Sequence, residues 1–388
     1  MIRPLAAATL AACALALISI VPAAAEDGVT ADGITFGQAA PLDGPASALG
    51  KGMRLGITAA FDEVNRRGGV HGRKLTLVSR DDGYEPDRSI VETRKLIEAD
   101  KVFALIGAVG TPTSKATQPI TTAAKVPFIG PFTGAAFLRD PKLDNVINVR
   151  AGYDAETEAW IKHLTEDLKI SKIAIFYQDD AFGRAGLDGV KAAMQRRGME
   201  LVAEATYERN TVAVKTALLT LKRAEPEAVV MVGAYTPCAE FIRLARKIDF
   251  TPTFVNISFV GAAALARELG ADGKGVIVSQ VVPFPWDASL PVVADYQAAI
   301  KAVDPAAPAD FVSLEGYLVG RLAIAALDKA GADPTRDGLV KAVKNTGKFD
   351  IGGLVMTFGP NKNSGLDEVF MTVIQADGSF KAVEKLTM

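Results

Sequence analysis

Short apolar segments of strand length alternate with longer segments of helical period along almost the whole chain, and few folds accept this alternation. The first round predicts strands over 34–36, 74–79, 103–106 and 126–129, separated by helices over 50–66 and 87–99. Strands that alternate with helices in this way are typical of a parallel sheet covered by helices.

A second round begins near Arg150 and predicts another series of the same kind. Its predicted helices are 155–168, 186–197, 212–222, 239–246 and 262–269, and its strands are 172–177, 200–207, 228–232, 253–257 and 275–283. About 360 residues remain after a predicted leader, which is more than one core usually holds. The sequence therefore predicts an α/β fold with two doubly wound, Rossmann-like lobes.

After Pro283 the pattern changes to three helices in succession, predicted over 292–303, 313–330 and 336–344. A strand over 354–358 follows, and then a hairpin of strands 368–374 and 380–385 joined through Ala376-Asp-Gly378. Three helices without strands of their own must cover a sheet that is already built. We therefore expect the chain to return to the first lobe and then to cross again.

The first residues have the pattern of a secretory signal peptide. Arg3 precedes an apolar run from Leu5 to Val21, and small residues lead to Ala25, after which we expect cleavage. The stretch Leu10-Ala-Ala-Cys13 resembles a lipobox, so a lipoprotein is the second interpretation. Both interpretations predict an exported protein, and we expect it in the periplasm.

Charge and cysteine content argue against a nucleic-acid-binding protein and against a protein stabilised by an internal disulfide. The chain has 43 basic and 45 acidic side chains without a basic run, so nucleic-acid binding is not expected. Cys13 leaves with the predicted leader and Cys238 remains alone, which excludes an internal disulfide in the mature chain.

The sequence has little that resembles an enzymatic motif. His71 and His163 are the two histidines, and neither has a nucleophile pattern beside it. The segment Gly44–Gly52 imitates a phosphate-binding loop, but its spacing is wrong and Gly52 stands where a hydroxyl should hold magnesium. The pairs 81–82 and 179–180 are acidic, but carboxylates at strand ends commonly cap turns. We predict no catalytic residue, no metal site and no cofactor.

Residues suited to holding a ligand recur where predicted strands end, which is where open α/β sheets bind ligands. The turn Gly107–Ser114 raises the question of whether its hydroxyls bind an anion at a helix N-terminus or merely cap the helix. The candidate binding residues are Thr111, Thr113, Ser114, Phe132, Thr133 and Gly134 from the first lobe, and Phe182, Tyr235, Thr236, Ser258 and Phe259 from the second.

Five stretches together resemble the type I periplasmic binding proteins of the leucine/isoleucine/valine-binding family. They are Phe36-Gly-Gln-Ala-Ala-Pro-Leu-Asp-Gly, Glu63-Val-Asn-Arg-Arg-Gly-Gly-Val-His-Gly-Arg-Lys-Leu with Asp81-Asp82, Tyr177-Gln-Asp-Asp-Ala-Phe-Gly, and Phe358-Gly-Pro. The resemblance implies two lobes joined by three hinge crossovers, with one lobe made of 26–149 and 282–355 and the other of 150–281 and 356–388. It implies a monomeric receptor, not an enzyme, that presents a small molecule to the permease of an ABC importer in the inner membrane.

The resemblance also suggests roles for single residues. Thr111 and Thr133-Gly134 lie where the family binds the ligand carboxylate, Phe182 lies where many members have tyrosine, and Tyr235 matches an aromatic wall. Ser258 stands near a family glutamate that pairs with the ligand ammonium. Because a buried ammonium without a carboxylate is costly, we expect a carboxylate-bearing aromatic or aliphatic ligand.

Alternatives remain open at this stage. Asp43, Asp179, Asp180 or Glu315 could rebuild an ammonium site, which would restore a branched-chain amino acid binder. Phe182, Phe259 and Phe284 could be core residues instead of pocket residues, and Trp286 could belong to a rim, a lid or a hinge cover. The same fold also serves as a sensing module for a membrane receptor or kinase, and an exported hydrolase is a weaker rival.

Overall fold

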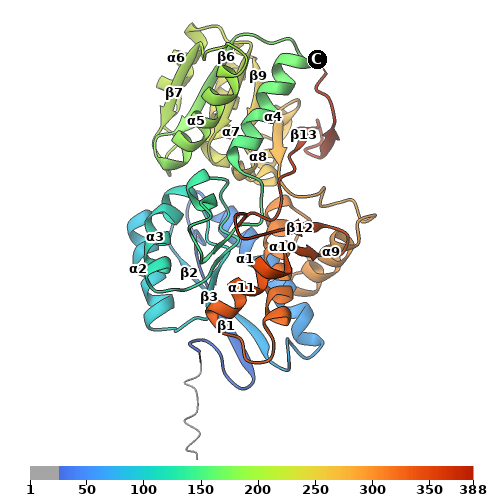
Figure 1. Ribbon diagram of the computed structural model, residues 1–388. Coiled ribbons are helices and arrows are strands. Elements are labelled where there is room, and N and C mark those ends of the chain that lie inside the picture. The colour runs from blue at the N-terminus through green and yellow to red at the C-terminus, as the bar shows by residue number, and fades with distance from the viewer. Residues whose placement is uncertain (1–25, 388) are drawn as a thin grey trace, which may run out of the picture.

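The computed structural model describes residues 26–387, so the predicted signal peptide and Cys13 lie outside the described residues. The chain forms two lobes, each built on its own mainly parallel sheet, with one lobe above the other in Figure 1. This agrees with the two lobes predicted from the sequence.

The first sheet has five parallel strands in the order β2-β1-β3-β4-β5. Their bounds are β1 Gly33–Ala40, β2 Lys74–Asp81, β3 Ala104–Ile106, β4 Phe128–Ile129 and β5 Val146–Ile147. The residues of β3, β4 and β5 are all buried, as expected for strands that are covered on both faces.

The second sheet has seven strands in the order β14-β13-β10-β9-β8-β6-β7. Its parallel strands are β6 Ile173–Gln178, β7 Ala203–Tyr207, β8 Ala228–Val232, β9 Thr253–Asn256 and β10 Ile277–Gln280. The predicted C-terminal hairpin, β13 Phe370–Ile374 and β14 Phe380–Val383, joins this sheet antiparallel to β10. The chain's last hairpin thus belongs to the second sheet.

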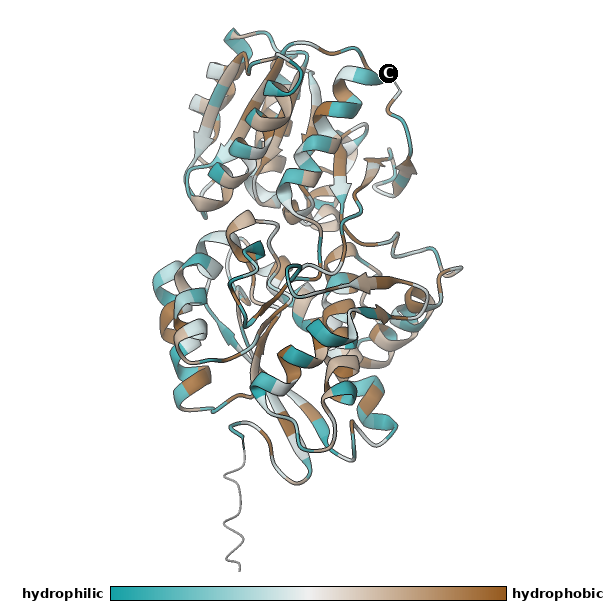
Figure 2. Ribbon diagram, in the orientation of Figure 1, coloured by the Kyte–Doolittle hydropathy of each residue, from teal (hydrophilic) through white to brown (hydrophobic). Residues whose placement is uncertain are grey.

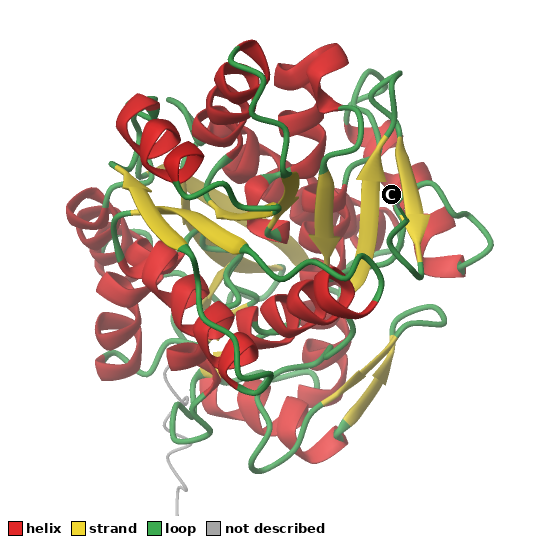
Figure 3. Cartoon of the chain, turned by 90° about the horizontal axis from the view of Figure 1, so that it is seen from above, coloured by secondary structure: helices red, strands yellow, loops and turns green. Residues whose placement is uncertain are grey.

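Helices cover both faces of the sheets, as Figure 3 shows from above. In the first lobe they are α1 Ser47–Arg66, α2 Pro86–Glu98, α3 Thr111–Ala123, the 3-10 turn η1 Ala136–Arg139, α9 Pro291–Val303, α10 Phe311–Ala330 and α11 Arg336–Thr346. In the second they are α4 Tyr153–Glu166, α5 Ala181–Gln195, α6 Lys215–Arg223, α7 Tyr235–Lys247, α8 Ala262–Leu269 and the turns η2 Ser258–Val260 and η3 Gly270–Gly273. Hydrophobic residues concentrate in the strands and on the inner sides of the helices (Figure 2).

The return of the chain to the first lobe is visible in the contact between α1 and α10. A Cβ on Gly56 of α1 would lie 2.0 Å from the carbonyl oxygen of Ser313, so only glycine permits this close crossing. The sequence did not predict β11 Lys348–Asp350, which pairs antiparallel with β12 Val355–Thr357 in a separate two-stranded sheet.

Across residues 26–387, no helix combines the length and the apolar character needed to cross a membrane. Cys238 is buried with a free thiol, in agreement with the cysteine count.

Candidate functional site

The segments that follow the carboxyl ends of the strands meet between the lobes. Tyr84, after β2, accepts a hydrogen bond from Gln178 of β6 at 3.3 Å. Glu85 accepts one from Arg209, after β7, at 2.8 Å. The Ala48 backbone N–H at the start of α1 donates to the Tyr235 hydroxyl of α7 at 3.2 Å. The crevice between the lobes is therefore closed in this structure.

The turn before α3 does not use its hydroxyl groups as caps. Gly110 is the N-cap residue, and no side chain accepts a capping hydrogen bond there. Thr113 donates its hydroxyl back to the carbonyl of Gly110 at 3.0 Å, and Ser114 is buried with no partner for its hydroxyl among the described residues. The capping interpretation is wrong for this turn.

Thr111 instead turns toward the neighbouring strand end. Its hydroxyl lies 2.6 Å from the hydroxyl of Thr133, which lies 3.3 Å from the phenol oxygen of Tyr153. All three side chains are buried, and burial raises the pKa of Tyr153, so that its phenol stays protonated. The three groups form a chain of hydroxyls in the crevice that can donate to an acceptor.

Aromatic rings from both lobes meet beside these hydroxyls. We call Tyr84, Phe132, Phe182 and Phe259 the aromatic cluster. The Phe259 ring lies at its centre, with centroids 5.9 Å from Tyr84, 5.3 Å from Phe132 and 4.5 Å from Phe182. Two of these rings come from each lobe, and all four are buried in the hydrophobic core. Phe182 and Phe259 therefore belong both to the core and to the crevice.

Two glycines allow the close packing around the cluster. Gly110 has φ +107°, and a Cβ there would lie 2.3 Å from Cε2 of Tyr84. At Gly134, a Cβ would lie 2.4 Å from Cδ1 of Tyr153. The role of Gly134 in the structure is thus to let the Tyr153 ring approach.

Two adjacent candidates on α7 have different surroundings. Tyr235 contacts the other lobe through its hydroxyl, as described above. Thr236 donates its hydroxyl to Glu268 of α8 at 2.9 Å, within its own lobe. Thr236 therefore makes its side-chain hydrogen bond within one lobe and does not take part in the contact that Tyr235 makes with the other lobe.

Ser258 is engaged by the protein itself. Its backbone N–H and its hydroxyl both donate to Glu156 of α4, each at 2.9 Å, and Ser279 also donates to this carboxylate. Arg150 in turn donates to the Ser258 hydroxyl. Ser258 is thus bonded to a buried acid from a different element, α4.

Arg150 is the largest charged group in the crevice and is only 1% exposed. Its Cζ lies 4.5 Å from the centre of the Phe132 ring, and its Nε lies 3.2 Å from Glu315 of α10. No acceptor among residues 26–387 has hydrogen-bond geometry toward Nε or Nη1. Burial raises the pKa of Glu315 to about 7, although the positive charge of Arg150 opposes this shift.

A cavity of about 10 Å³ lies beside these groups and is lined by Arg150, Glu315, Phe132 and Ser258 among others. This is barely the space of one water molecule. A ligand of several atoms can therefore reach Arg150 only after the lobes separate or the rings move.

The other acids at strand ends have local partners, as expected for residues that cap turns. Asp82 accepts from the backbone N–H of Tyr84, and burial raises its pKa to about 6. Asp180 caps α5 and pairs with Arg209, whereas Asp179 pairs with Arg184. Asp43 accepts from the N–H of Gly44.

Catalytic and metal-binding groups do not gather in the described part of the chain. His163 contacts Asp167 at 2.7 Å one helical turn away, and His71 lies 3.2 Å from the carbonyl of Asp328. Across residues 26–387, no group of three or more His, Cys, Asp or Glu side chains is arranged to hold a metal ion.

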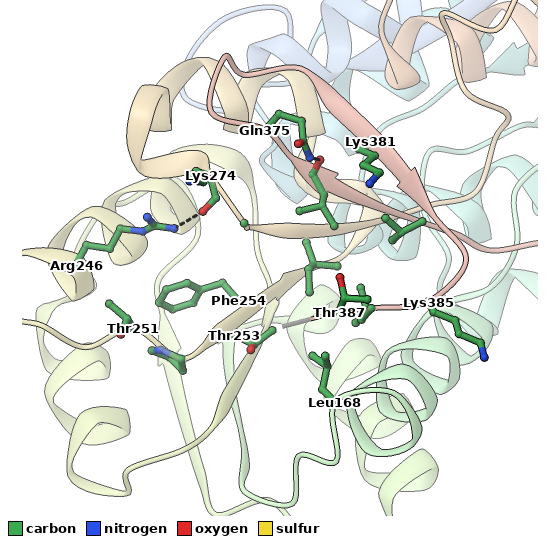
Figure 4. Close-up of a pocket in the computed structure, with 16 residues that line it drawn as sticks. Leu168, Arg246, Thr251, Thr253, Phe254, Lys274, Gln375, Lys381, Lys385 and Thr387 are labelled. Carbon is green, nitrogen blue, oxygen red and sulfur yellow. Dashed lines mark hydrogen bonds between the residues drawn. The ribbon is translucent and has the colours of Figure 1, made fainter.

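A cavity of about 480 Å³ lies elsewhere (Figure 4). It is lined by residues at the amino ends of β9 and β10 and by the C-terminal hairpin, with Arg246 donating to the carbonyl of Lys274 at 2.8 Å. Ligands of doubly wound sheets bind at the opposite, carboxyl ends of the strands. We therefore place the functional site in the crevice and not in this cavity.

Five residues of the crevice were missed as binding candidates, namely Tyr84, Tyr153, Arg150, Glu156 and Glu315. Tyr84 follows the acidic pair 81–82, so the rule on strand ends could have found it. In the sequence Arg150 marks only the start of the second predicted lobe, and Glu315 is predicted only as an alternative partner for an ammonium group. Arg150 and Glu315 pair with each other although they are 165 positions apart in the sequence, and no local pattern indicates such a contact.

Comparisons with known proteins agree with this architecture. The family described as "Periplasmic binding protein" matches residues 33–379. A Leu/Ile/Val-binding protein of Rhizobium johnstonii is 27% identical over 344 residues, with 87% of this chain and 89% of that protein covered. The crystal structure of a possible leucine/isoleucine/valine-binding protein from Rhodopirellula baltica is 39% identical with a TM-score of 0.88, covering 93% of this chain and 99% of that one. A substrate-binding periplasmic protein from Ralstonia solanacearum is 26% identical with a TM-score of 0.85, covering 90% and 100%.

Proposed function

This chain belongs to the periplasmic binding protein family, and on that premise we propose that it captures a small carboxylate-bearing compound between its lobes. The family consists of solute-binding proteins of ABC transporters and not of enzymes. The bound compound would be aromatic or aliphatic apart from its carboxylate. The closed protein would then deliver it to the permease of an importer of the branched-chain amino acid type.

The observation that supports this proposal is the composition of the crevice. The hydroxyls of Thr111, Thr133 and Tyr153 can donate to a carboxylate, and the aromatic cluster offers an apolar surface beside them. Glu156 and Glu315, the two buried acids of the crevice, are both engaged by protein groups. A ligand ammonium would have to displace one of those groups.

Capture and release would work through three crossings of the chain. We propose hinges near 149–150, 280–283 and 354–357, which separate a lobe of residues 26–149 and 282–355 from one of residues 150–281 and 356–388. Closure is favoured when the ligand contacts both lobes, because the open state lacks half of these contacts. The protein would act as a monomer in the periplasm after removal of residues 1–25.

A branched-chain amino acid is the competing ligand, because the relative from Rhizobium johnstonii is named as a Leu/Ile/Val-binding protein. A thermal-shift screen of residues 26–388 against amino acids, aromatic acids, aliphatic acids, amides and polyols decides between the two classes. A ligand present at a hundred times its Kd adds about 2.7 kcal/mol to the free energy of unfolding. We expect acids to raise the Tm, whereas a shift with leucine or valine alone would contradict the proposed ligand class.

Turnover of a bound compound distinguishes a binding protein from an exported hydrolase. Incubation of each stabilising compound with the protein, followed by chromatography, should return the compound unchanged. A product would support the exported hydrolase instead.

Uptake by whole cells distinguishes a transport protein from a sensing module. Deletion of the gene should abolish uptake of the stabilising compound, and undiminished uptake would favour sensing.

A further inference from the structure

Arg150 is a buried cation whose donors are only partly used. It contacts Glu315 by charge, Ser258 by a hydrogen bond and Phe132 through the ring face. Two of its three nitrogens, Nε and Nη1, have no hydrogen-bond acceptor among the described residues. Buried polar groups normally find acceptors, so a guanidinium left in this state points to an acceptor that arrives with a ligand.

The charges around Arg150 are balanced without a ligand. Arg150, Glu156 and Glu315 are buried, and the partly buried Arg139 is the second cation whose charge acts on Glu315. Arg139 donates Nη1 to the carbonyl of Ala135 and Nη2 to the carbonyls of Arg150 and Ala151, so backbone groups occupy both of its terminal nitrogens. Glu156 accepts from Ser258 and Ser279. Among residues 26–387, the Glu315 carboxylate has a polar contact with Arg150 alone, and it is therefore the acid that can change its charge.

We infer that Arg150 is the specificity-determining residue of the crevice: it binds the ligand carboxylate in competition with Glu315, so that an anionic ligand binds together with one proton that Glu315 takes up. This inference rests on the proposed function and deepens it. It specifies the ligand as an organic anion. It also assigns the discrimination between that anion and its uncharged amide to a single residue, Arg150.

The need for a proton follows from the balance of charge. With both acids ionised, the group of four side chains is neutral, and a bound carboxylate would leave one unpaired negative charge in a buried site. Such a charge is costly unless it is neutralised. Protonation of Glu315 at its carboxylate removes the excess and frees Arg150 for the ligand.

Other groups packed against α10 do not compete for this role. Glu63 of α1 and Asp295 of α9 pair with Arg321 on another side of α10. On α11, Arg336 donates to backbone carbonyls of residues 102 and 103, Lys341 pairs with Asp337, and Lys344 pairs with Asp144. The charged groups that act on Glu315 are Arg150, Glu156 and Arg139. Burial already holds the pKa of Glu315 near 7, so a small further rise suffices for proton uptake at neutral pH.

Matched acid and amide pairs test the inference, with benzoate against benzamide and hexanoate against hexanamide as probes. Calorimetric titration of residues 26–388 between pH 6 and pH 9 gives the Kd of each probe. We expect the acids to bind more tightly than their amides, with a Kd that rises by up to about tenfold per pH unit above pH 7. Below the pKa of Glu315 in the free protein, the Kd should level off.

Two variants separate binding from folding. Glu315→Gln should bind the acids at pH 9 at least tenfold more tightly than the unchanged protein and should lose the pH dependence. The double variant R150Q/E315Q removes both charges together, which avoids leaving one buried ion unpaired. It should bind acid and amide equally. Glu63→Gln is the matched control, because this partly buried carboxylate pairs with Tyr317 and Arg321 outside the crevice.

The outcomes distinguish the inference from the function on which it rests. A pH dependence that survives in Glu315→Gln, or a preference for acids that survives in the double variant, overturns the inference while transport of acids stands. Binding of leucine or valine without any acid overturns the inference but leaves a solute-binding protein. If no compound of the wider screen binds, both the inference and the proposed function fall.

Discussion

Tyr235 gives the most direct test at the scale of one residue. Its hydroxyl accepts a hydrogen bond from Ala48 of the other lobe, so the bond exists only in the closed form. Replacement by phenylalanine removes the bond and keeps the ring. We expect the Kd of any captured ligand to rise roughly fivefold, because one such bond contributes about 1 kcal/mol. Calorimetric titration measures the change.

The neighbouring residue provides the control for Tyr235. Thr236→Ala removes a hydroxyl whose partner, Glu268, lies in the same lobe. This variant should keep the Kd of the unchanged protein. If both variants weaken binding equally, the effect comes from disturbance of α7 and not from the contact between the lobes.

The candidate residues show how far single positions can be predicted from sequence. The rule that ligands bind at the carboxyl ends of strands led to Thr111 and Thr133, whose hydroxyls are 2.6 Å apart, and to Phe132 and Phe259, whose ring centroids are 5.3 Å apart. Their contact with a ligand stays a prediction. Arg150 could not be found in this way, because its burial depends on Glu315 of a helix far along the chain. Sequence shows a charge, but only the assembled fold shows that the charge is buried.

At the scale of elements, the start of α5 depends on Asp180. This carboxylate accepts from the backbone N–H of Phe182 and pairs with Arg209. Asp180→Ala leaves the first turn of the helix without its cap, and we expect a loss of about 1–2 kcal/mol in the free energy of unfolding. Urea unfolding of the ligand-free protein measures this loss.

Asp179 is the matched control for this helix start. It is half exposed and pairs with the exposed Arg184 at 3.0 Å, so Asp179→Ala should cost less than about 0.5 kcal/mol. Equal losses in the two variants would show that the capping bond contributes nothing particular to α5.

Elements with a strong signal in their own residues were predicted well, and those without such a signal were not. The buried strands β6 and β8 are continuous apolar runs, which local sequence makes plain. By contrast, β11 has three residues of which only Phe349 is buried, and it is ordered by pairing with β12. A strand that exists because of its partner leaves little signal in its own residues.

At the scale of the whole molecule, the alternation of strands and helices was sufficient to predict two lobes. The three helices after Pro283 further indicated the return to the first lobe, where α10 crosses α1 at Gly56. How firmly the lobes close could not be predicted in this way. It depends on side chains such as Arg209 and Glu85, which are 124 positions apart and meet only across the crevice.

Arg209 tests whether these contacts set the balance between open and closed forms. It pairs with Glu85 of the other lobe as well as with Asp180 of its own, whereas Arg184 pairs within its lobe only. We expect Arg209→Ala to raise the Kd about two- to fivefold and to enlarge the radius of gyration of the ligand-free protein in X-ray scattering, because a partly exposed ion pair contributes up to about 1 kcal/mol. Arg184→Ala removes the same charge, so any general effect of charge on an anionic ligand appears in both variants. Only the excess effect of Arg209→Ala measures the contact between the lobes, and without such an excess the closed form is held by the aromatic cluster and not by the ion pair.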